Sequence, residues 1–150
     1  MLDYFQYVLD PDGGIGSEAE KMIALPFGDG LQKWLQLSPS FNIDKVTTPL
    51  LDVGLGPHSL LFMWLPYAMM HHLNKPVELV MLNMDDGLGT LSAEHVLTNP
   101  GFRLASQGGS VDWFRFWLQG YEDPNPGKKT QYRRWEALRH LQEQNQRQTH

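Results

Sequence analysis

The sequence predicts an α/β fold, and three observations lead to this prediction. Residues 48–53 and residues 77–82 are short apolar runs with the length and composition of buried strands. The residues between these runs carry apolar side chains at helical spacing. A strand, a helix and a second strand in this order predict two parallel strands of one sheet, joined by a right-handed crossover.

The segment before the first strand is predicted to contain two short helices. Residues 3–9 suit the first helix, whereas residues 10–30 contain glycine and proline with little periodicity and are predicted to be a loop. Residues 30–37 are predicted to form about two helical turns that end at Ser38 and Pro39. The apolar side chains of these turns are Leu31, Trp34, Leu35 and Leu37.

A loop and a helix are predicted between the two strands. Gly54, Gly56 and Pro57 close the first strand and predict the loop. The helix is predicted over residues 58–73 and ends before Pro76. Its stripe of side chains at three-and-four spacing consists of Leu61, Leu65, Ala68, Met69 and His72.

The second strand is followed by a long loop over residues 83–98 and then by a helix. Asn99 is the predicted N-cap of this helix and Pro100 its first residue. The glycine pair at 108–109 is expected to interrupt or kink the helix, which ends at Gly120. The apolar stripe of its second half consists of Val111, Phe114, Trp117 and Leu118.

A terminal amphipathic helix is predicted over residues 128–146, after a linker over residues 121–127. Its apolar side chains are Tyr132, Trp135, Leu138 and Leu141. The basic residues Lys128, Lys129, Arg133 and Arg134 are predicted to form a solvated helix face near Glu122 and Asp123.

The chain is therefore divided into three segments. Residues 1–37 precede the first strand, residues 38–120 form the α/β portion, and residues 121–150 form the linker and the terminal helix. A sheet of two parallel strands leaves backbone groups unpaired at its edges. Either further strands are present, or a partner pairs with the open edge, or the chain is part of a larger domain.

Composition excludes several classes of protein. The net charge of -5 argues against nucleic acid as a partner. The absence of cysteine excludes disulfides and thiolate metal sites, and no residue pattern predicts a metal or a cofactor. No apolar run reaches the roughly 18 residues of a membrane helix, and the first residues do not resemble a signal peptide. We expect a soluble protein, whose compartment stays open.

Several segments resemble the prolyl oligopeptidase family of serine peptidases. Residues 38–42 and 45–51 resemble the entry to the penultimate strand of the family's α/β-hydrolase domain, and residues 74–80 resemble the segment before its last strand. Residues 94–100, E-H-V-L-T-N-P, resemble the loop that carries the catalytic histidine. Residues 111–124 are similar to the family's terminal helix and tail. The resemblance implies the C-terminal portion of an α/β-hydrolase fold.

The resemblance also implies a mechanism in which a serine attacks a carbonyl, a histidine acts as the base and an acid orients the histidine. His95 matches the position of the base. No G-x-S-x-G occurs, so the nucleophile is absent and the chain is expected to be inactive alone. Asp52 is the candidate for the acid, because residues 54–59 contain no carboxylate. A complete domain would take a peptide or ester substrate.

Other interpretations stay open at this point. His95 can be a surface or capping histidine, and Asp52 a strand residue paired by the backbone or by a basic neighbour. The chain can be a non-catalytic binding or regulatory module that pairs with another chain through its sheet edge. It can also be a small esterase that uses Ser59 or Ser110, although neither lies on a strand-to-helix elbow.

Overall fold

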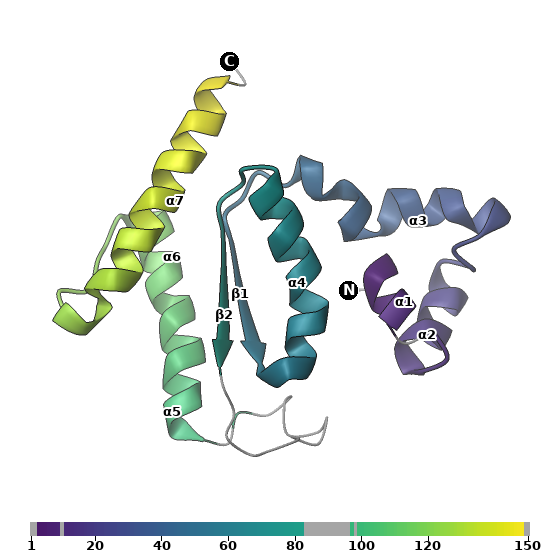
Figure 1. Cartoon of the computed structure of the whole chain (residues 1–150), viewed down its shortest axis with the longest axis horizontal. Helices are drawn as coiled ribbons and strands as arrows, with labels where there is room; N and C mark the ends of the chain where they lie inside the picture. Colours follow the sequence, from purple (N-terminus) through teal and green to yellow (C-terminus); the bar gives the residue numbers. More distant parts are fainter. Residues whose placement is uncertain (1–2, 10, 83–96, 98, 149–150) are drawn as a thin grey trace.

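The computed structural model describes residues 3–9, 11–82, 97 and 99–148 (Figure 1). Its α-helices and strands, in chain order, are α1 (Tyr4–Leu9), α2 (Gly14–Met22), α3 (Leu31–Leu37), β1 (Leu50–Leu55), α4 (Gly56–His72), β2 (Val77–Leu82), α5 (Pro100–Arg103), α6 (Gly109–Gln119) and α7 (Lys129–Gln148). Short 3-10 turns cover Gly28–Gly30, Pro39–Lys45 and Pro126–Lys128, and a π-helical turn covers Leu104–Gly108. The predicted α/β class is confirmed.

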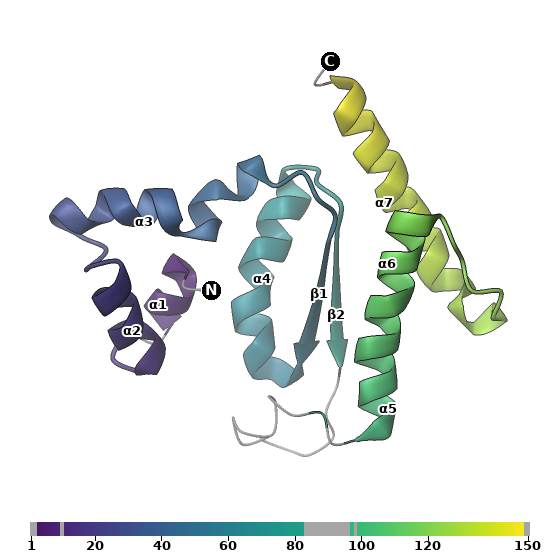
Figure 2. The same cartoon turned by 180° about the vertical axis from the view of Figure 1, so that it is seen from behind.

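The two strands form a parallel sheet, as predicted. Leu50 lies opposite Val77, and the register continues to Leu55 opposite Leu82. Within the described part of the chain, these are the two strands of the sheet. Figures 1 and 2 show α4 on one face of the sheet and α6 with α7 on the other face. Both faces are therefore covered, as parallel sheets require.

The prediction of a loop over residues 10–30 is wrong, because α2 lies within this segment. The buried residues Ala19 and Ile23 pack with Tyr7 of α1 and Trp34 of α3 in one cluster. Burial of these apolar groups outweighs the low helix propensity of the glycines in α2. The predicted helices over residues 3–9 and 30–37 are confirmed by α1 and α3.

The predicted loop after the first strand is also absent. The strand continues through Gly54 to Leu55, and α4 begins at the next residue, Gly56. The backbone of Gly56 has a φ of 82°, a conformation that side chains disfavour. At Gly54 the backbone is not strained, but a Cβ would lie 2.4 Å from Sδ of Met81, so the flexible Met81 side chain would have to move. Small residues thus permit a direct reversal from strand to helix.

The predicted apolar stripes of α4 and α6 are only partly buried: Leu65 and Ala68 of α4 and Trp117 of α6 are half-buried. In α4, Leu61 and Met69 are exposed, whereas Met70 packs with Ile43 and Val77. In α6, Val111, Phe114 and Leu118 are exposed, while Trp113 and Phe116 are buried and Trp117 is half-buried. Both helices carry apolar side chains on more than one face, so spacing alone does not identify the face that packs.

The terminal helix α7 confirms its prediction, since Tyr132 and Trp135 are buried against Trp113 and Phe116 of α6. The expected solvated basic face is only partly correct. Lys128 pairs with the buried Asp112 over 2.8 Å and with Asp123 over 2.7 Å. The guanidinium of Arg134 donates from Nε and Nη2 to Oε1 of Glu78, over 3.0 and 2.7 Å. These ion pairs connect the turn before α7 to α6, and α7 to β2.

Candidate functional site

The carboxyl edge of the sheet is the candidate functional site. β1 and β2 end in register at Leu55 and Leu82, and in open α/β sheets this edge carries the ligand-binding loops. The segment that leaves β2 contains His95, together with Asp85 and Asp86, and all three lie outside the described residues. The elements on both sides of this segment are described.

The far end of this segment is fixed by the start of α5. Oδ1 of Asn99 accepts a hydrogen bond from the amide of Gly101 over 2.8 Å, and Pro100 occupies the first turn. Nε of Arg103 donates to the carbonyl of Leu97. The predicted cap is confirmed, and it holds the chain a few residues after His95 in a defined conformation.

Asp52 is the third residue of β1 and lies opposite Leu79. Because side chains alternate along a strand, it shares a face with Leu50, which packs under α4 with Ile43 and Met70. Burial raises the pKa of the Asp52 carboxyl from 3.8 to about 6. Its Oδ2 is buried and has no hydrogen-bond partner among the described residues.

The position of Asp52 within β1 sets its distance from the carboxyl edge of the sheet. The end of β1 at Leu55 lies three positions after Asp52, which corresponds to roughly 10 Å along the strand. The junction from Gly54 to Ser59 places no carboxylate at the carboxyl edge itself. Asp52 is therefore the acid candidate of β1, set back beneath α4 from the edge where His95 follows β2.

The two serines that are candidates for an alternative nucleophile bond to backbone carbonyls four residues before them. Oγ of Ser59 donates to the carbonyl of Leu55 over 3.1 Å, and Oγ of Ser110 donates to the carbonyl of Ser106 over 2.9 Å. Each bond reaches back four residues, an ordinary arrangement for serine in a helix. Neither hydroxyl is bonded to a histidine in the described structure, as an activated nucleophile requires.

The histidines with described side chains lie away from the carboxyl edge. His71 and His72 are exposed at the end of α4, which is the opposite end of the sheet, and His140 is exposed on α7. His58 belongs to the first turn of α4. Among the residues that the structure describes, no three or more histidine and acidic side chains are grouped to hold a metal ion.

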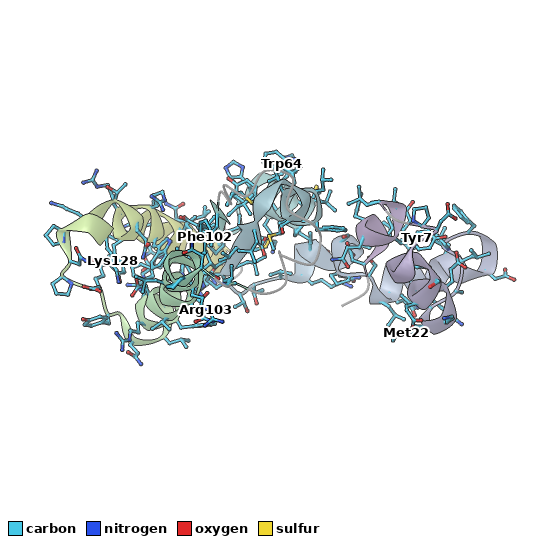
Figure 3. All side chains as sticks on the ribbon, turned by 90° about the horizontal axis from the view of Figure 1, so that it is seen from below. Tyr7, Met22, Trp64, Phe102, Arg103 and Lys128 are labelled. Atoms are coloured by element: carbon cyan, nitrogen blue, oxygen red, sulfur yellow. The ribbon has the colours of Figure 1, made fainter. Side chains whose placement is uncertain are left out.

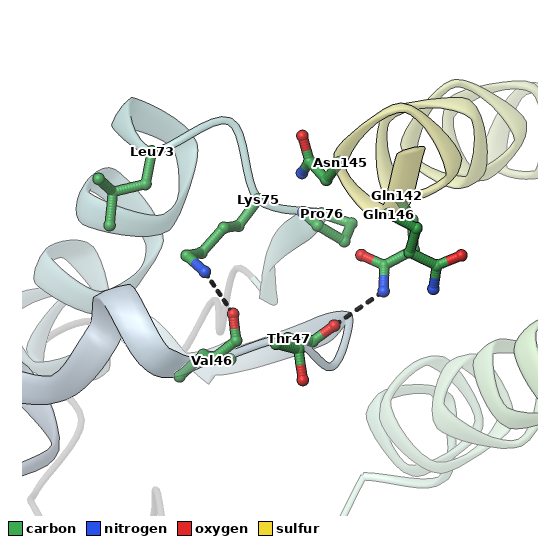
Figure 4. A pocket seen from close by; sticks show the side chains of 8 residues that line it. All are labelled: Val46, Thr47, Leu73, Lys75, Pro76, Gln142, Asn145 and Gln146. Carbon is green, nitrogen blue, oxygen red and sulfur yellow. Dashed lines mark hydrogen bonds between the residues drawn. The ribbon is translucent and has the colours of Figure 1, made fainter. Parts of the chain in front are cut away.

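A cavity of about 270 Å³ lies at the amino end of the strands, between the segment before β1 and the end of α7 (Figure 4). Lys75 lines it and donates from Nζ to the carbonyl of Val46, and Gln142 donates to the carbonyl of Thr47 over 2.8 Å. The bond from Gln142 connects α7 to the segment before β1 at the amino edge. The cavity is therefore far from the candidate site.

No helix in the described ranges is long and apolar enough to cross a membrane.

No family model matches the chain. It is similar to Lasso peptide isopeptidase AtxE2 from Asticcacaulis excentricus, with 34% identity over 110 residues. The matched region is 73% of this chain and 14% of that protein.

Two solved structures of AtxE2 isopeptidase share the fold. A variant with Astexin3-dC4 bound has a TM-score of 0.71 and 31% identity, and the match covers 94% of this chain and 20% of that chain. The apo structure has a TM-score of 0.64 and 32% identity, with coverage of 87% and 19%. The chain thus spans about a fifth of the length of this relative.

Proposed function

We propose that this chain supplies the C-terminal portion of a peptide-cleaving α/β-hydrolase domain. The premise is that the chain is homologous to part of AtxE2, a serine peptidase of the prolyl oligopeptidase family. The observation that carries the proposal is the match at 31% identity over 94% of the chain to a solved AtxE2 structure, in the same α/β arrangement. In this proposal the serine comes from sequence outside the chain.

His95 is the proposed base. It takes the proton from the serine hydroxyl as the serine attacks the carbonyl, and it returns that proton to the leaving amine. A histidine suits both steps because its ordinary pKa lies near neutral pH. Its place after β2, before the cap at Asn99, is the support for this role.

Asp52 is the proposed acid that orients His95. Support comes from its burial in β1, next to the strand that leads to His95, and from the unpaired Oδ2. In this role, the carboxylate accepts a hydrogen bond from the second ring nitrogen and stabilises the charged imidazole.

The proposed substrate is a peptide. One AtxE2 structure has Astexin3-dC4 bound, and the relative is named an isopeptidase. The chain covers only a fifth of that protein, so the residues that select a particular peptide lie mostly outside it. Acyl transfer from an amide is the reaction class that His95 and a serine nucleophile carry out.

The test is a chimera in which this chain replaces the matched portion of AtxE2. A fluorophosphonate probe, which labels activated serines, is applied to the free chain, to the chimera and to the chimera with His95→Ala. We expect no labelling of the free chain, labelling of the chimera, and a loss of about a thousandfold or more in labelling rate for His95→Ala. His140→Ala, at an exposed position on α7, is the matched control and should label normally.

Labelling of the free chain would contradict the proposal, because a serine within residues 1–150 would then be the nucleophile. Labelling of the chimera that does not depend on His95 would remove the proposed base. Asp52→Ala in the chimera tests the acid in the same assay. We expect it to slow labelling, while Asp44→Ala, an exposed acid outside the sheet, leaves it unchanged.

A second candidate function is a non-catalytic binding module. One observation favours it: β1 passes directly into α4, and residues 54–59 place no carboxylate at the carboxyl edge. A chimera that is folded by circular dichroism, yet is not labelled by the probe, would select this candidate over the first.

A further inference from the structure

The start of α5 is fixed by an ordinary helix cap and by a further bond from a side chain. In the cap, the amide of Gly101 donates to Oδ1 of Asn99 over 2.8 Å, and the amide of Arg103 donates to the carbonyl of Asn99 over 3.0 Å. These bonds satisfy donors of the first helical turn. They fix the chain from Asn99 onward, and neither reaches the residues before Asn99.

The further bond holds the carbonyl of Leu97, which lies before the cap. The helical pattern offers this carbonyl no donor, because the amide of Gly101, four residues later, is bonded to Oδ1 of Asn99. Its partner is the side chain of Arg103, whose Nε donates to it over 2.5 Å. A hydrogen bond from a guanidinium is charge-assisted and therefore stronger than a bond between neutral groups. Arg103 thus closes the chain around the cap.

Arg103 belongs to a helix that is anchored in the protein core. Figures 1 and 2 show α5 and α6 in one line, and the backbone at Leu104 and Gly108 between them stays in the right-handed helical region. At the other end of this line, Phe116 of α6 is fully buried against α7. The anchored helix therefore gives the side chain of Arg103 a defined starting point.

Packing in the core does not account for the side chain of Arg103. Figure 3 shows Phe102 on the side of the helix toward the middle of the molecule and Arg103 on its outer side, and Phe102 is half-buried whereas Arg103 is exposed. Holding a long exposed side chain in one conformation costs entropy, and an exposed arginine adds little to a core. The bond to Leu97 therefore orders the chain before α5 more than it stabilises the fold.

We propose that Arg103 is a positioning residue for His95. His95 precedes Leu97 by two residues, so a fixed Leu97 carbonyl limits the positions that the backbone of His95 can take. Proton transfer requires the base within hydrogen-bond distance of the nucleophile, and a displacement of about 1 Å can cost roughly a hundredfold in rate. In this role Arg103 does not touch the reacting atoms. The inference rests on the proposed function, since it takes His95 as the base.

The first measurement follows the backbone of the free chain by nitrogen-15 relaxation. In the wild-type chain, Leu97 should have an order parameter of about 0.85, as a rigid backbone does. Arg103→Met removes the donor but keeps the length and the helix propensity of the side chain, so the order parameter of Leu97 should fall below about 0.6. Asn99 and Gly101, which the cap fixes, should keep theirs. Arg133→Met, at an exposed arginine of α7, is the matched control and should leave Leu97 unchanged.

The second measurement is the rate at which the fluorophosphonate probe labels the AtxE2 chimera described above. Arg103→Met should lower this rate about tenfold or more at an unchanged melting temperature, because His95 is held less often in the reactive position. Arg103→Lys keeps a charged donor without the planar guanidinium, and it should recover part of the rate. Arg133→Met should be labelled normally. A residue that only stabilises the fold would instead lower the melting temperature together with the rate.

The outcomes separate this inference from the proposed function. A Leu97 that is mobile in the wild-type chain, or that stays ordered in Arg103→Met, overturns the inference. A chimera that is labelled equally fast with and without Arg103→Met also overturns it, while the proposed function stands. If no form of the chimera is labelled, the proposed function fails, and the order parameter of Leu97 alone decides whether Arg103 fixes the backbone beside His95.

Discussion

At the scale of single residues, burial disfavours the ionised form of the Asp52 carboxyl in the described structure. It has a buried oxygen without a hydrogen-bond partner there, and burial raises the pKa of its carboxyl to about 6. Asp112 is buried as well, but Lys128 lies 2.8 Å away and compensates its charge. An unpaired buried carboxylate is a cost to folding that a structural role does not explain.

Asp52→Asn should make the stability of the chain less dependent on pH. The folded pKa of about 6 lies above the ordinary 3.8, so the folded state binds more protons between these values and stability falls as pH rises through this window. Above pH 6 the variant should be more stable by about 1–2 kcal/mol, less than the whole shift implies, because the side chain is partly solvated. Urea unfolding at pH 4 and pH 7.5 measures this difference.

Asp44→Asn, at an exposed position, is the control for this measurement. If the stability of the wild-type chain changed with pH in the same way as that of Asp52→Asn, the Asp52 carboxyl would have a partner in solution. It could then not be described as an unpaired buried group.

At the scale of elements, α6 has two apolar faces with different roles. Phe116 is fully buried, and the guanidinium of Arg139 lies 3.7 Å from the centre of its ring. Phe114, two residues earlier, faces solvent. The inner face packs α6 on α7, whereas the outer face is exposed.

Phe116→Ala should destabilise the free chain by about 3–5 kcal/mol, since it leaves a cavity among Trp113, Tyr132 and Trp135. Phe114→Ala should change the free chain by no more than about 0.5 kcal/mol. Urea unfolding followed by circular dichroism compares the two variants on one helix. Equal effects of both variants would mean that Phe114 is buried in the free chain, contrary to the structure.

At the scale of the whole molecule, the described residues form three separate hydrophobic clusters. One joins α1, α2 and α3 around Trp34, one lies between α6 and α7 around Phe116, and one lies under α4 around Met70. The carboxylate of Asp3 accepts hydrogen bonds from Ser38 and Ser40, and α1 also contacts α4 and the turn Pro39–Lys45. Clusters without shared members can open independently.

Trp34→Ala should therefore loosen only the N-terminal helices. Trp34 is fully buried, and its Nε1 donates to the carbonyl of Ala24 over 2.8 Å. Amides of α1–α3 should lose most of their protection from hydrogen exchange, while those of α6 and α7 keep theirs. Trp135→Ala is the reciprocal variant and should loosen α6 and α7. Equal loss of protection in all helices after Trp34→Ala would show that the chain unfolds as one cooperative unit.

Local signals in the sequence determined where most elements lie. Both strands were predicted because their apolar runs are short and bounded by glycine or proline, and the cap at Asn99 and the end of α6 at Gly120 depend on neighbouring residues only. The terminal helix followed from its spacing of Tyr132 and Trp135. These features need no information about the rest of the fold.

The tertiary structure alone decided which faces are buried and which charges are paired. α2 exists because Ala19 reaches Trp34, and Met70 rather than Leu61 is buried because α4 is apolar on all sides and the sheet selects the face. The burial of Asp52 depends on α4 lying above β1, and the pairing of Lys128 with Asp112 joins residues of two different elements. Sequence periodicity records that a side chain is apolar, but burial and ion pairing are properties of contacts between distant parts of the chain.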